Sequence, residues 1–160
     1  MNLSNYRIVL LDKSHDRKTF DCGNDILNHY FTHQASQDVK RRANSCYVVV
    51  DKNNQVAGFY TLCSASMPYH ELNDTLKKKL ARYRYLPAVL IERLAIDIRH
   101  KGQGLGSVLL ANAIKQATQS PIASSVIIVE AKDDNAIAFY RHFGFLSFVS
   151  VSDKLYYPLT

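Results

Sequence analysis

The feature that most constrains this chain is a glycine-rich turn between a strand-like segment and a strongly apolar helical pattern. Gly102, Gly104 and Gly106 stand at alternate positions after the segment Val89–Ile98, and the segment Leu105–Ala117 follows. Glycine permits backbone conformations and close approaches that a Cβ would block, so successive N–H groups here can converge on an anion. The start of the following helix adds its positive dipole end. The pattern favours a pyrophosphate site, and a tight structural turn explains the glycines about equally well.

Two common nucleotide-binding motifs do not match this turn. A dinucleotide-binding Rossmann fingerprint needs the spacing GxGxxG early in the chain, with an acidic residue about twenty residues further on. The glycines here follow the spacing GxGxG near the middle of the chain. A P-loop needs Gly-Lys followed by Ser or Thr, and that tripeptide is absent from the sequence. The sequence therefore excludes both motifs.

Length and composition indicate one globular domain over residues 1–160. With 47% hydrophobic and 21% charged residues, the chain can bury an ordinary core without a metal or disulfide. Its cysteines, Cys22, Cys46 and Cys63, are odd in number and lack CxxC spacing, which favours free thiols in a reducing cytoplasm. The apolar run Ile8–Leu11 is too short for a signal peptide or a membrane span. We therefore expect a soluble, untargeted cytoplasmic protein.

The positive charge is concentrated in two clusters. The chain carries 20 Lys and Arg against 14 Asp and Glu, a net charge of +6. The whole excess lies between Lys77 and Lys101, where eight basic residues accompany only Glu92 and Asp97. A second cluster is Lys40, Arg41 and Arg42. Tyr69, Tyr83 and Tyr85 are interleaved with the first cluster, which favours contact with phosphates and stacked bases over ordinary solvated faces.

Periodicity and turn residues predict the remaining elements. Strands are expected at Arg7–Leu11, Cys46–Val50, Val56–Cys63, Val89–Ile98, Ser125–Val129, Phe145–Val151 and Lys154–Tyr157, with a hairpin at Asp51–Asn54. Helices are expected after the cap Asn24 or Asp25, over His70–Tyr83, over Leu105–Ala117, and from Asp133 or Asp134 to Gly144. The inward face of the first helix is predicted to contain Ile26, Leu27, Tyr30, Phe31 and Ala35. In His70–Tyr83, the leucines are expected inward and the lysines outward.

Two motifs resemble those of the GNAT superfamily of acetyl-CoA-dependent N-acetyltransferases. Arg99-x-x-Gly102-x-Gly104 is similar to the superfamily's acetyl-CoA motif, and Leu94–Asp97 resembles the strand before it. The segment Asn135–Phe145 is similar to the second signature of the superfamily. Two motifs in the right order are more specific than either alone. The resemblance implies a GNAT fold of the α/β (α+β) class, with a central mixed, mostly antiparallel sheet flanked by helices.

Within the superfamily, the chain resembles the TacT-like toxins of bacterial toxin-antitoxin modules. This narrower resemblance rests on Phe20–Gly23 with Leu27-Asn28, on Gly58–Leu62 and on Ile91–Ala95. It implies acetylation of the α-amino group of aminoacyl-tRNA, which blocks translation. It also implies a homodimer and silencing by an antitoxin with a ribbon-helix-helix DNA-binding part. Two alternatives stay open: acetylation of a small amine or protein N-terminus, and a non-catalytic module that binds RNA or a partner.

The resemblance implies a role for each site residue. Tyr140 carries over as the general acid that protonates the sulfur of coenzyme A; an ordinary phenol stays protonated at neutral pH. The residues implied to bind acetyl-CoA are Leu94, Ala95, Ile96, Arg99, His100, Lys101, Gly102, Gln103, Gly104, Leu105, Gly106, Ser107, Asn135 and Phe139. The residues expected to contact tRNA are Lys40, Arg41, Arg42, Lys77, Lys78, Lys79, Arg82, Arg84 and Arg93. Arg93 is next to the cofactor strand, so a structural role is the alternative for it.

No general base stands out, although Glu92 and Glu130 lie near the expected strands. A lysine amine with a pKa of about 10.4 is almost fully protonated at pH 7, whereas an α-amine with a pKa of about 7.7–8.0 is on the order of 10–20% neutral. An α-amine therefore needs less help from a base, which favours an aminoacyl ester as the substrate. His29 and His33 have metal-like spacing but lack the glutamate of a zinc-protease helix, so we expect no metal site.

Overall fold

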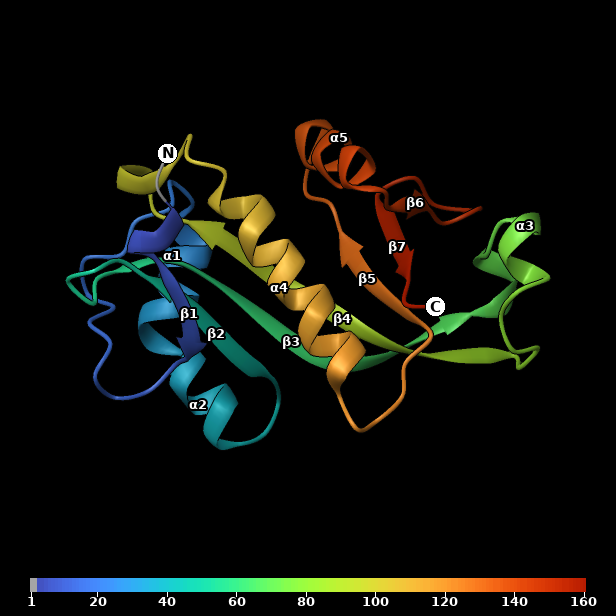
Figure 1. Ribbon diagram of the computed structural model, residues 1–160, viewed down its shortest axis with the longest axis horizontal. Coiled ribbons are helices and arrows are strands. Elements are labelled where there is room, and N and C mark those ends of the chain that lie inside the picture. The colour runs from blue at the N-terminus through green and yellow to red at the C-terminus, as the bar shows by residue number, and fades with distance from the viewer. Residues whose placement is uncertain (1–2) are drawn as a thin grey trace. The chain divides into compact units, whose positions relative to one another are not determined.

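The computed structural model describes residues 3–160 and contains one seven-stranded mixed sheet (Figure 1). The strand order is β1-β2-β3-β4-β5-β7-β6. The strands are β1 Arg7–Leu10, β2 Ser45–Val50, β3 Val56–Pro68, β4 Tyr85–Ile96, β5 Val126–Glu130, β6 Leu146–Ser147 and β7 Lys154–Pro158. The helices are α1 Asp25–His33, α2 Ala35–Lys40, α3 Asp74–Lys77, α4 Leu105–Gln119 and α5 Asp134–Phe143, with short 3-10 turns η1 Leu3–Asn5, η2 Tyr69–Glu71 and η3 Ile98–His100. The predicted mixed sheet flanked by helices is confirmed.

The sheet combines antiparallel pairs with a parallel pair. β1 with β2, β2 with β3, β5 with β7 and β6 with β7 are antiparallel. β4 and β5 are parallel, with Ala88–Ile91 in register with Val126–Val129. A parallel pair needs a long crossover connection, and α4 provides it between β4 and β5.

The chain divides into two compact units. The first comprises the chain up to Cys63 together with Arg93–Ala113, and the second comprises Ser64–Glu92 together with Ile114–Thr160. The long strands β3 and β4 therefore each contribute to both units. The prediction of one domain over residues 1–160 stays a prediction.

In the first unit, the alternation of side chains on β3 places helices on opposite faces of the sheet. Phe59 stacks on Phe31 of α1, with ring centroids 4.3 Å apart. Its neighbour Tyr60 points to the other face, where its hydroxyl donates to the Oδ1 of Asn112 on α4 at 2.6 Å. Figure 1 shows α4 crossing in front of β3. Phe59 and Tyr60 thus fix α1 and α4 on opposite sides of the same strand.

The apolar core of this unit lies under α1 and α2. It consists of Phe20, Cys22, Tyr30, Phe31, Ala35, Cys46, Val48, Val50, Val56, Phe59 and Ala95. The side chain of Asn24 caps α1 by accepting from the Leu27 amide, as predicted, and the helical pattern is interrupted at Gln34. The prediction that Ile26 faces inward is wrong, because Ile26 is 81% exposed. It lies in the first turn of α1, beside Leu27, which does pack against the core.

The second unit has a separate core between the strands and the segment Tyr69–Leu80. Its members are Met67, Leu72, Leu80, Leu86, Ala88, Val126, Ile128, Phe148 and Tyr156. The Tyr156 hydroxyl also accepts a hydrogen bond from the Asn73 amide at 3.0 Å. The predicted helix over His70–Tyr83 is therefore mostly wrong, although Leu72 and Leu80 are buried as expected. Asn73 has an extended backbone, and its side chain caps the four-residue helix α3, which interrupts any longer helix.

The predicted strand Phe145–Val151 is also mostly wrong, since only Leu146–Ser147 pairs as β6. Beyond it, the chain turns toward Glu71, whose side chain is buried. The Glu71 carbonyl accepts from the Val149 amide, and its carboxylate accepts from the Ser150 hydroxyl at 2.6 Å. These bonds compete with strand pairing, and a buried carboxylate with such partners was not apparent from the sequence.

Other expectations are confirmed. The hairpin joins β2 to β3 around Asp51–Asn54, and α5 begins after the cap Asp133 and ends at Gly144. Gly144 has a φ of 113°, a conformation that glycine adopts far more readily than other residues. The three cysteines are free thiols. None of the helices in residues 3–160 combines the length and apolar character that crossing a membrane requires.

We predict that Gly58→Ala destabilises the protein by about 1–3 kcal/mol. A Cβ at this position on β3 would lie 2.7 Å from the Ile96 Cδ1 and 2.8 Å from the Ala95 carbonyl oxygen, and the backbone atom cannot move away cheaply. Urea unfolding measures the decrease in the free energy of unfolding. Lys52→Ala, an exposed change on the same hairpin, is the control, and equal stability of the two variants would contradict the prediction.

Candidate functional site

The glycine-rich turn follows β4 in the first unit. β4 ends at Ile96, the 3-10 turn Ile98–His100 follows, and α4 begins at Leu105. Gly102 and Gly104 have φ values of 79° and 78°, in the left-handed region that favours glycine. Gly106 lies within the first turn of α4 instead. Two of the three predicted glycines are therefore needed for the backbone conformation of the turn.

The surroundings of the turn fit a bound diphosphate. A Cβ added at Gly102 would have no atom within 4 Å, so open space lies beside the backbone there. Leu105 is buried and anchors the start of α4, whereas Ser107 is exposed. A helix of this length directs free N–H groups and a positive dipole end toward its start. The start of α4 and the open side of Gly102 thus offer donors and space for an anionic ligand, whereas the amides of Arg99 and His100 already donate to Asp97.

The strand before the turn alternates between buried and partly exposed side chains. Ala95 is buried, whereas Leu94 and Ile96 are partly exposed. Gly58 on β3 lies against Ala95 and Ile96 and leaves room for both. The three strand residues predicted to contact the cofactor therefore lie next to one another and lead directly into the turn.

A buried carboxylate lies at the base of the turn. Asp97 is fully buried, and its carboxylate accepts four hydrogen bonds: from the Arg99 amide (2.9 Å), Nε (2.9 Å) and Nη2 (2.8 Å), and from the Asp21 amide (3.1 Å). Burial alone would raise the pKa of Asp97, but these bonds, above all those from Arg99, outweigh it and hold the pKa below its ordinary value. Asp97 is therefore a charged, paired group.

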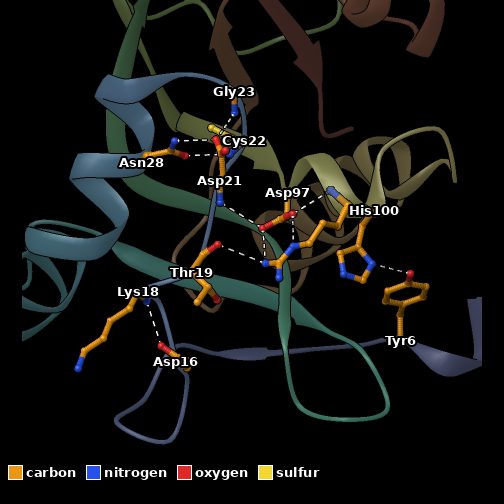
Figure 2. A network of polar contacts seen from close by, with 11 residues as sticks. Tyr6, Asp16, Lys18, Thr19, Asp21, Cys22, Gly23, Asn28, Asp97 and His100 are labelled. Carbon is orange, nitrogen blue, oxygen red and sulfur yellow. Dashed lines mark hydrogen bonds and ion pairs between the residues drawn. The ribbon is translucent and has the colours of Figure 1, made fainter.

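The rest of the turn is joined to two other segments, and Figure 2 shows the contact between Tyr6 and His100. On one side, Tyr6 pairs through its hydroxyl with the His100 Nδ1 at 2.9 Å and donates to the Gln103 Oε1 at 3.1 Å. On the other side, the Lys101 Nζ donates to the Cys22 carbonyl oxygen at 3.0 Å. Neither Tyr6 nor the loop Thr19–Gly23 was predicted to contact the turn. The motif spacing gives no signal for contacts between residues that are 79 to 97 positions apart.

The second unit contains the predicted residues of α5. Asn135 is exposed in the first turn of the helix, and Phe139 and Tyr140 are partly buried with their rings in an edge contact. Tyr140 also lies against Phe145, with ring centroids 5.5 Å apart. Burial raises the pKa of Tyr140 to about 12, because the ionised phenolate would lose its hydration. Tyr140 therefore keeps its proton at any physiological pH, more firmly than the sequence alone indicated.

The predicted tRNA-binding residues fall into both units. In the second unit, Lys77 ends α3, and Lys78, Lys79, Arg82 and Arg84 follow it on the surface. Tyr83 and Tyr85 are 69% and 53% exposed, and the Arg84 guanidinium lies over the Tyr85 ring. This stretch, Lys77–Tyr85, is called the basic segment below. It combines cations and exposed aromatic rings, as contact with single-stranded nucleic acid requires.

In the first unit, Lys40, Arg41 and Arg42 are exposed at the end of α2. Arg93 differs from them, because its guanidinium lies 3.6 Å from the ring centroid of the buried Tyr30. The Tyr30 hydroxyl in turn donates to the Asp38 carboxylate at 2.7 Å. This position corresponds to the structural role that the sequence left open for Arg93.

The sequence contains two further pairs of candidate residues. The rings of His29 and His33 lie 4.5 Å apart on α1, but within residues 3–160 no three His, Cys, Asp or Glu side chains gather as metal ligands would. The two candidate bases, Glu92 and Glu130, are both exposed.

Comparison with known proteins identifies the family. Residues 12–145 match the model of the Acetyltransferase (GNAT) family. The chain is 32% identical to the "tRNA-acetylating toxin" of Mycobacterium tuberculosis over 90% of this chain and 85% of the relative. It is 28% identical to the "Probable toxin TacT" of Sinorhizobium fredii, over 91% and 86%. The chain therefore belongs to the GNAT acetyltransferase family, whose acetyl donor is acetyl-CoA.

Solved structures agree with this assignment. AtaT complexed with acetyl-methionyl-tRNA(fMet) superimposes with a TM-score of 0.89 at 29% identity, covering 96% of this chain and 94% of that one. A KacT variant with one tyrosine changed to phenylalanine superimposes with a TM-score of 0.89 at 28% sequence identity, and the match covers 97% of this chain and 95% of that one. A similar AtaT variant was solved bound to acetyl-CoA and the C-terminus of the antitoxin AtaR. It superimposes with a TM-score of 0.81 at 26% sequence identity, and the match covers 97% of this chain and 94% of that one.

We predict that Tyr140 stays protonated as the pH rises through 10 and titrates near pH 12, since burial disfavours the phenolate. Carbon-13 NMR of the ring carbon that bears the hydroxyl follows this directly, with the resonance assigned by its loss in Tyr140→Phe. N-acetyl-tyrosine amide, with a pKa of about 10, is the reference. A midpoint at or below that of the reference would contradict the prediction.

Proposed function

We propose that this chain is a toxin that acetylates the α-amino group of aminoacyl-tRNA and so blocks translation. The observation that carries the proposal is the combination, in one chain, of a glycine turn suited to a diphosphate with similarity over most of its length to tRNA-acetylating toxins. The proposed substrate places its action in the cytoplasm.

The proposed roles of the turn follow from its amides. The backbone N–H groups from Lys101 to Gly104 bind the diphosphate, together with the start of α4 at Leu105, Gly106 and Ser107. The amides of Arg99 and His100, which the sequence motif also implied, donate to Asp97 instead. The side chains of His100, Lys101 and Gln103 lie along the same turn, where Tyr6 and Cys22 hold them. The backbone of Leu94–Ile96 pairs with the pantetheine arm, and one amide there stabilises the developing charge on the carbonyl oxygen. Asn135 and Phe139 contact the cofactor from α5.

Bound acetyl-CoA supplies an activated acetyl group as a thioester. Tyr140 provides the proton that the departing sulfur needs, and its raised pKa keeps that proton in place beforehand. The α-amine of an aminoacyl ester is neutral often enough at pH 7 to react without a strong base. This agrees with the exposed positions of Glu92 and Glu130, neither of which is enclosed as a tuned base would be.

The basic residues are proposed to bind tRNA mainly through its phosphates. The basic segment Lys77–Tyr85 offers five cations and two exposed tyrosines, and Lys40–Arg42 adds three cations in the other unit. Arg93 supports Tyr30 in this proposal and is not among the phosphate contacts. Because phosphate contacts release counterions, the affinity for tRNA should depend strongly on salt.

An antitoxin is the proposed protein partner, as for AtaT, which was solved bound to the C-terminus of AtaR. We infer that this antitoxin has a ribbon-helix-helix part and that the toxin forms a homodimer. A gene for a small ribbon-helix-helix protein beside the toxin gene, and co-purification of its product with this chain, would support the partner.

The decisive experiment incubates the purified protein with labelled acetyl-CoA and a full set of charged tRNAs. The expected result is label on the α-amine of at least one aminoacyl-tRNA, released as an N-acetyl amino acid when the ester is hydrolysed. Label on a small amine or a protein N-terminus, with none on charged tRNA, would overturn the proposed substrate.

We predict that Tyr140→Phe lowers kcat by roughly 10²- to 10⁴-fold, the usual contribution of a general acid. Calorimetric binding of acetyl-CoA should be unchanged, because the ring and its contacts remain. Tyr157→Phe is the matched control, since Tyr157 also lies against Phe145. Full activity of Tyr140→Phe would show that another group supplies the proton.

We predict that changing Lys77–Lys79 to glutamate raises the KM for charged tRNA and leaves kcat nearly unchanged. The slope of log KM against log salt should fall by about 0.7–0.9 for each phosphate that the variant no longer neutralises. Changing the exposed Lys52, Lys115 and Lys132 to glutamate alters the net charge equally and is the control. Equal effects of the two triple variants would argue against a specific basic surface.

A further inference from the structure

The conformation of the glycine turn is not fixed by packing within the turn itself. Gly102 and Gly104 are exposed, and nothing lies within 4 Å of a Cβ built at Gly102. A glycine-containing segment has more conformational freedom than any other when unfolded. Some other part of the chain has to hold the amides in one arrangement if they are to bind a diphosphate.

Four hydrogen bonds connect the loop Thr19–Cys22 to residues 97–101. The Asp21 amide donates to the Asp97 Oδ2 at 3.1 Å, and the Ile98 amide donates to the Asp21 carbonyl oxygen at 2.8 Å. The Arg99 Nη2 donates to the Thr19 carbonyl oxygen at 3.3 Å, and the Lys101 Nζ donates to that of Cys22 at 3.0 Å. Figure 2 shows Thr19, Asp21 and Cys22 gathered beside Asp97. These contacts span nearly eighty residues of sequence.

The loop itself is firmly anchored. Phe20 and Cys22 are buried in the core of the first unit, where Phe20 contacts Phe31 and Phe59. The Asn28 side chain on α1 accepts from the Cys22 amide at 2.8 Å and donates to the Asp21 carboxylate at 2.9 Å. A loop that is anchored in the core in this way can hold the turn in one conformation.

Arg99 directs its functional groups toward Asp97. Its amide, Nε and Nη2 all donate to the Asp97 carboxylate, and Nη2 also reaches Thr19. A cavity of about 230 Å³ lies beside Arg99, lined also by Asp16 and the polar residues Asn53–Gln55. This lining has one acidic and one basic side chain, so it has no excess positive charge that would attract a polyanion. The guanidinium is therefore bound to a carboxylate on one side and faces an electrically balanced cavity on the other.

We propose that Asp97 is a positioning residue for acetyl-CoA. Its carboxylate holds Arg99 and the Asp21 backbone so that the amides of residues 101–104, which follow the bonded amides of residues 98–100, stay directed at the diphosphate. Arg99 acts through Asp97 and is not itself a phosphate ligand. This inference rests on the proposed function, since it concerns how the chain binds the acetyl donor.

The test measures acetyl-CoA binding by calorimetry for the unaltered protein, Asp97→Asn, Arg99→Met and the double variant, at several salt concentrations. We expect each single change to raise the Kd about tenfold or more, the scale on which supporting partners act at ligand sites. The double variant should bind acetyl-CoA no more weakly than the single variant with the higher Kd, because both changes remove the same interaction. The salt dependence of binding should be the same in all four proteins.

A second readout separates positioning from a general loss of structure. Amide hydrogen exchange at Gly102 and Gly104 should be faster in Asp97→Asn, with exchange in the β2–β3 hairpin unchanged. In kinetic assays the KM for acetyl-CoA should rise, with kcat at saturation within about twofold, as expected when binding alone is weakened. Asp153→Asn, which neutralises an exposed acid in the turn before β7, is the control and should match the unaltered protein.

The outcomes are distinguishable. If Arg99→Met flattens the salt dependence and its effect adds to that of Asp97→Asn, Arg99 is a direct phosphate ligand and the inference is wrong. An unchanged Kd in both single variants also overturns it. If Asp97→Asn fails to fold, Arg99→Met decides alone through its salt dependence, since the Arg99 side chain is 47% exposed. Failure of the unaltered protein to bind acetyl-CoA would instead overturn the proposed function.

Discussion

The ion pair between the buried carboxylate of Asp97 and the half-exposed side chain of Arg99 is the interaction from which the candidate site is built. Taking a carboxylate out of water is costly, and it is tolerated only where hydrogen bonds and an opposite charge satisfy it fully. Asp97 meets this condition with four donors, three of them from Arg99. The glycine turn thus starts beside a residue whose hydrogen bonds connect β4 to the loop Thr19–Cys22, and this loop is anchored in the core of the first unit.

β3 has a comparable role for the helices. Because neighbouring side chains on a strand point to opposite faces, Phe59 and Tyr60 secure α1 and α4 on different sides of the sheet with adjacent residues. Gly58, directly before them, allows Ala95 and Ile96 of β4 to approach closely. Three consecutive residues therefore contact two helices and β4 within this unit.

Much of the fold was predictable from local patterns, because its long elements have strong periodicity and clear ends. The hairpin at Asp51–Asn54, the helix that begins at Leu105 and the helix from Asp133 to Gly144 were all predicted, the last two with a glycine turn or a cap residue as the signal. The segments His70–Tyr83 and Phe145–Val151 were predicted wrongly for one reason. Asn73 and Glu71 form side-chain and backbone bonds that compete with regular structure, and local periodicity does not register such partners. For the site, the motif located the turn, but the contacts of Tyr6 and Asp21 with it arise from the tertiary fold alone.

The surroundings of Tyr140 have a consequence for the state of the enzyme before it meets its ligands. Its ring lies against Phe139 and Phe145, and none of its hydrogen bonds within residues 3–160 involves the hydroxyl. Many buried tyrosines use their O–H to tie two parts of a fold together, as Tyr30 and Tyr60 do here. The Tyr140 hydroxyl is not engaged in that way. A ligand atom that accepts from this hydroxyl would therefore break no hydrogen bond within residues 3–160, so the proton donor that we propose would act without a rearrangement of its surroundings.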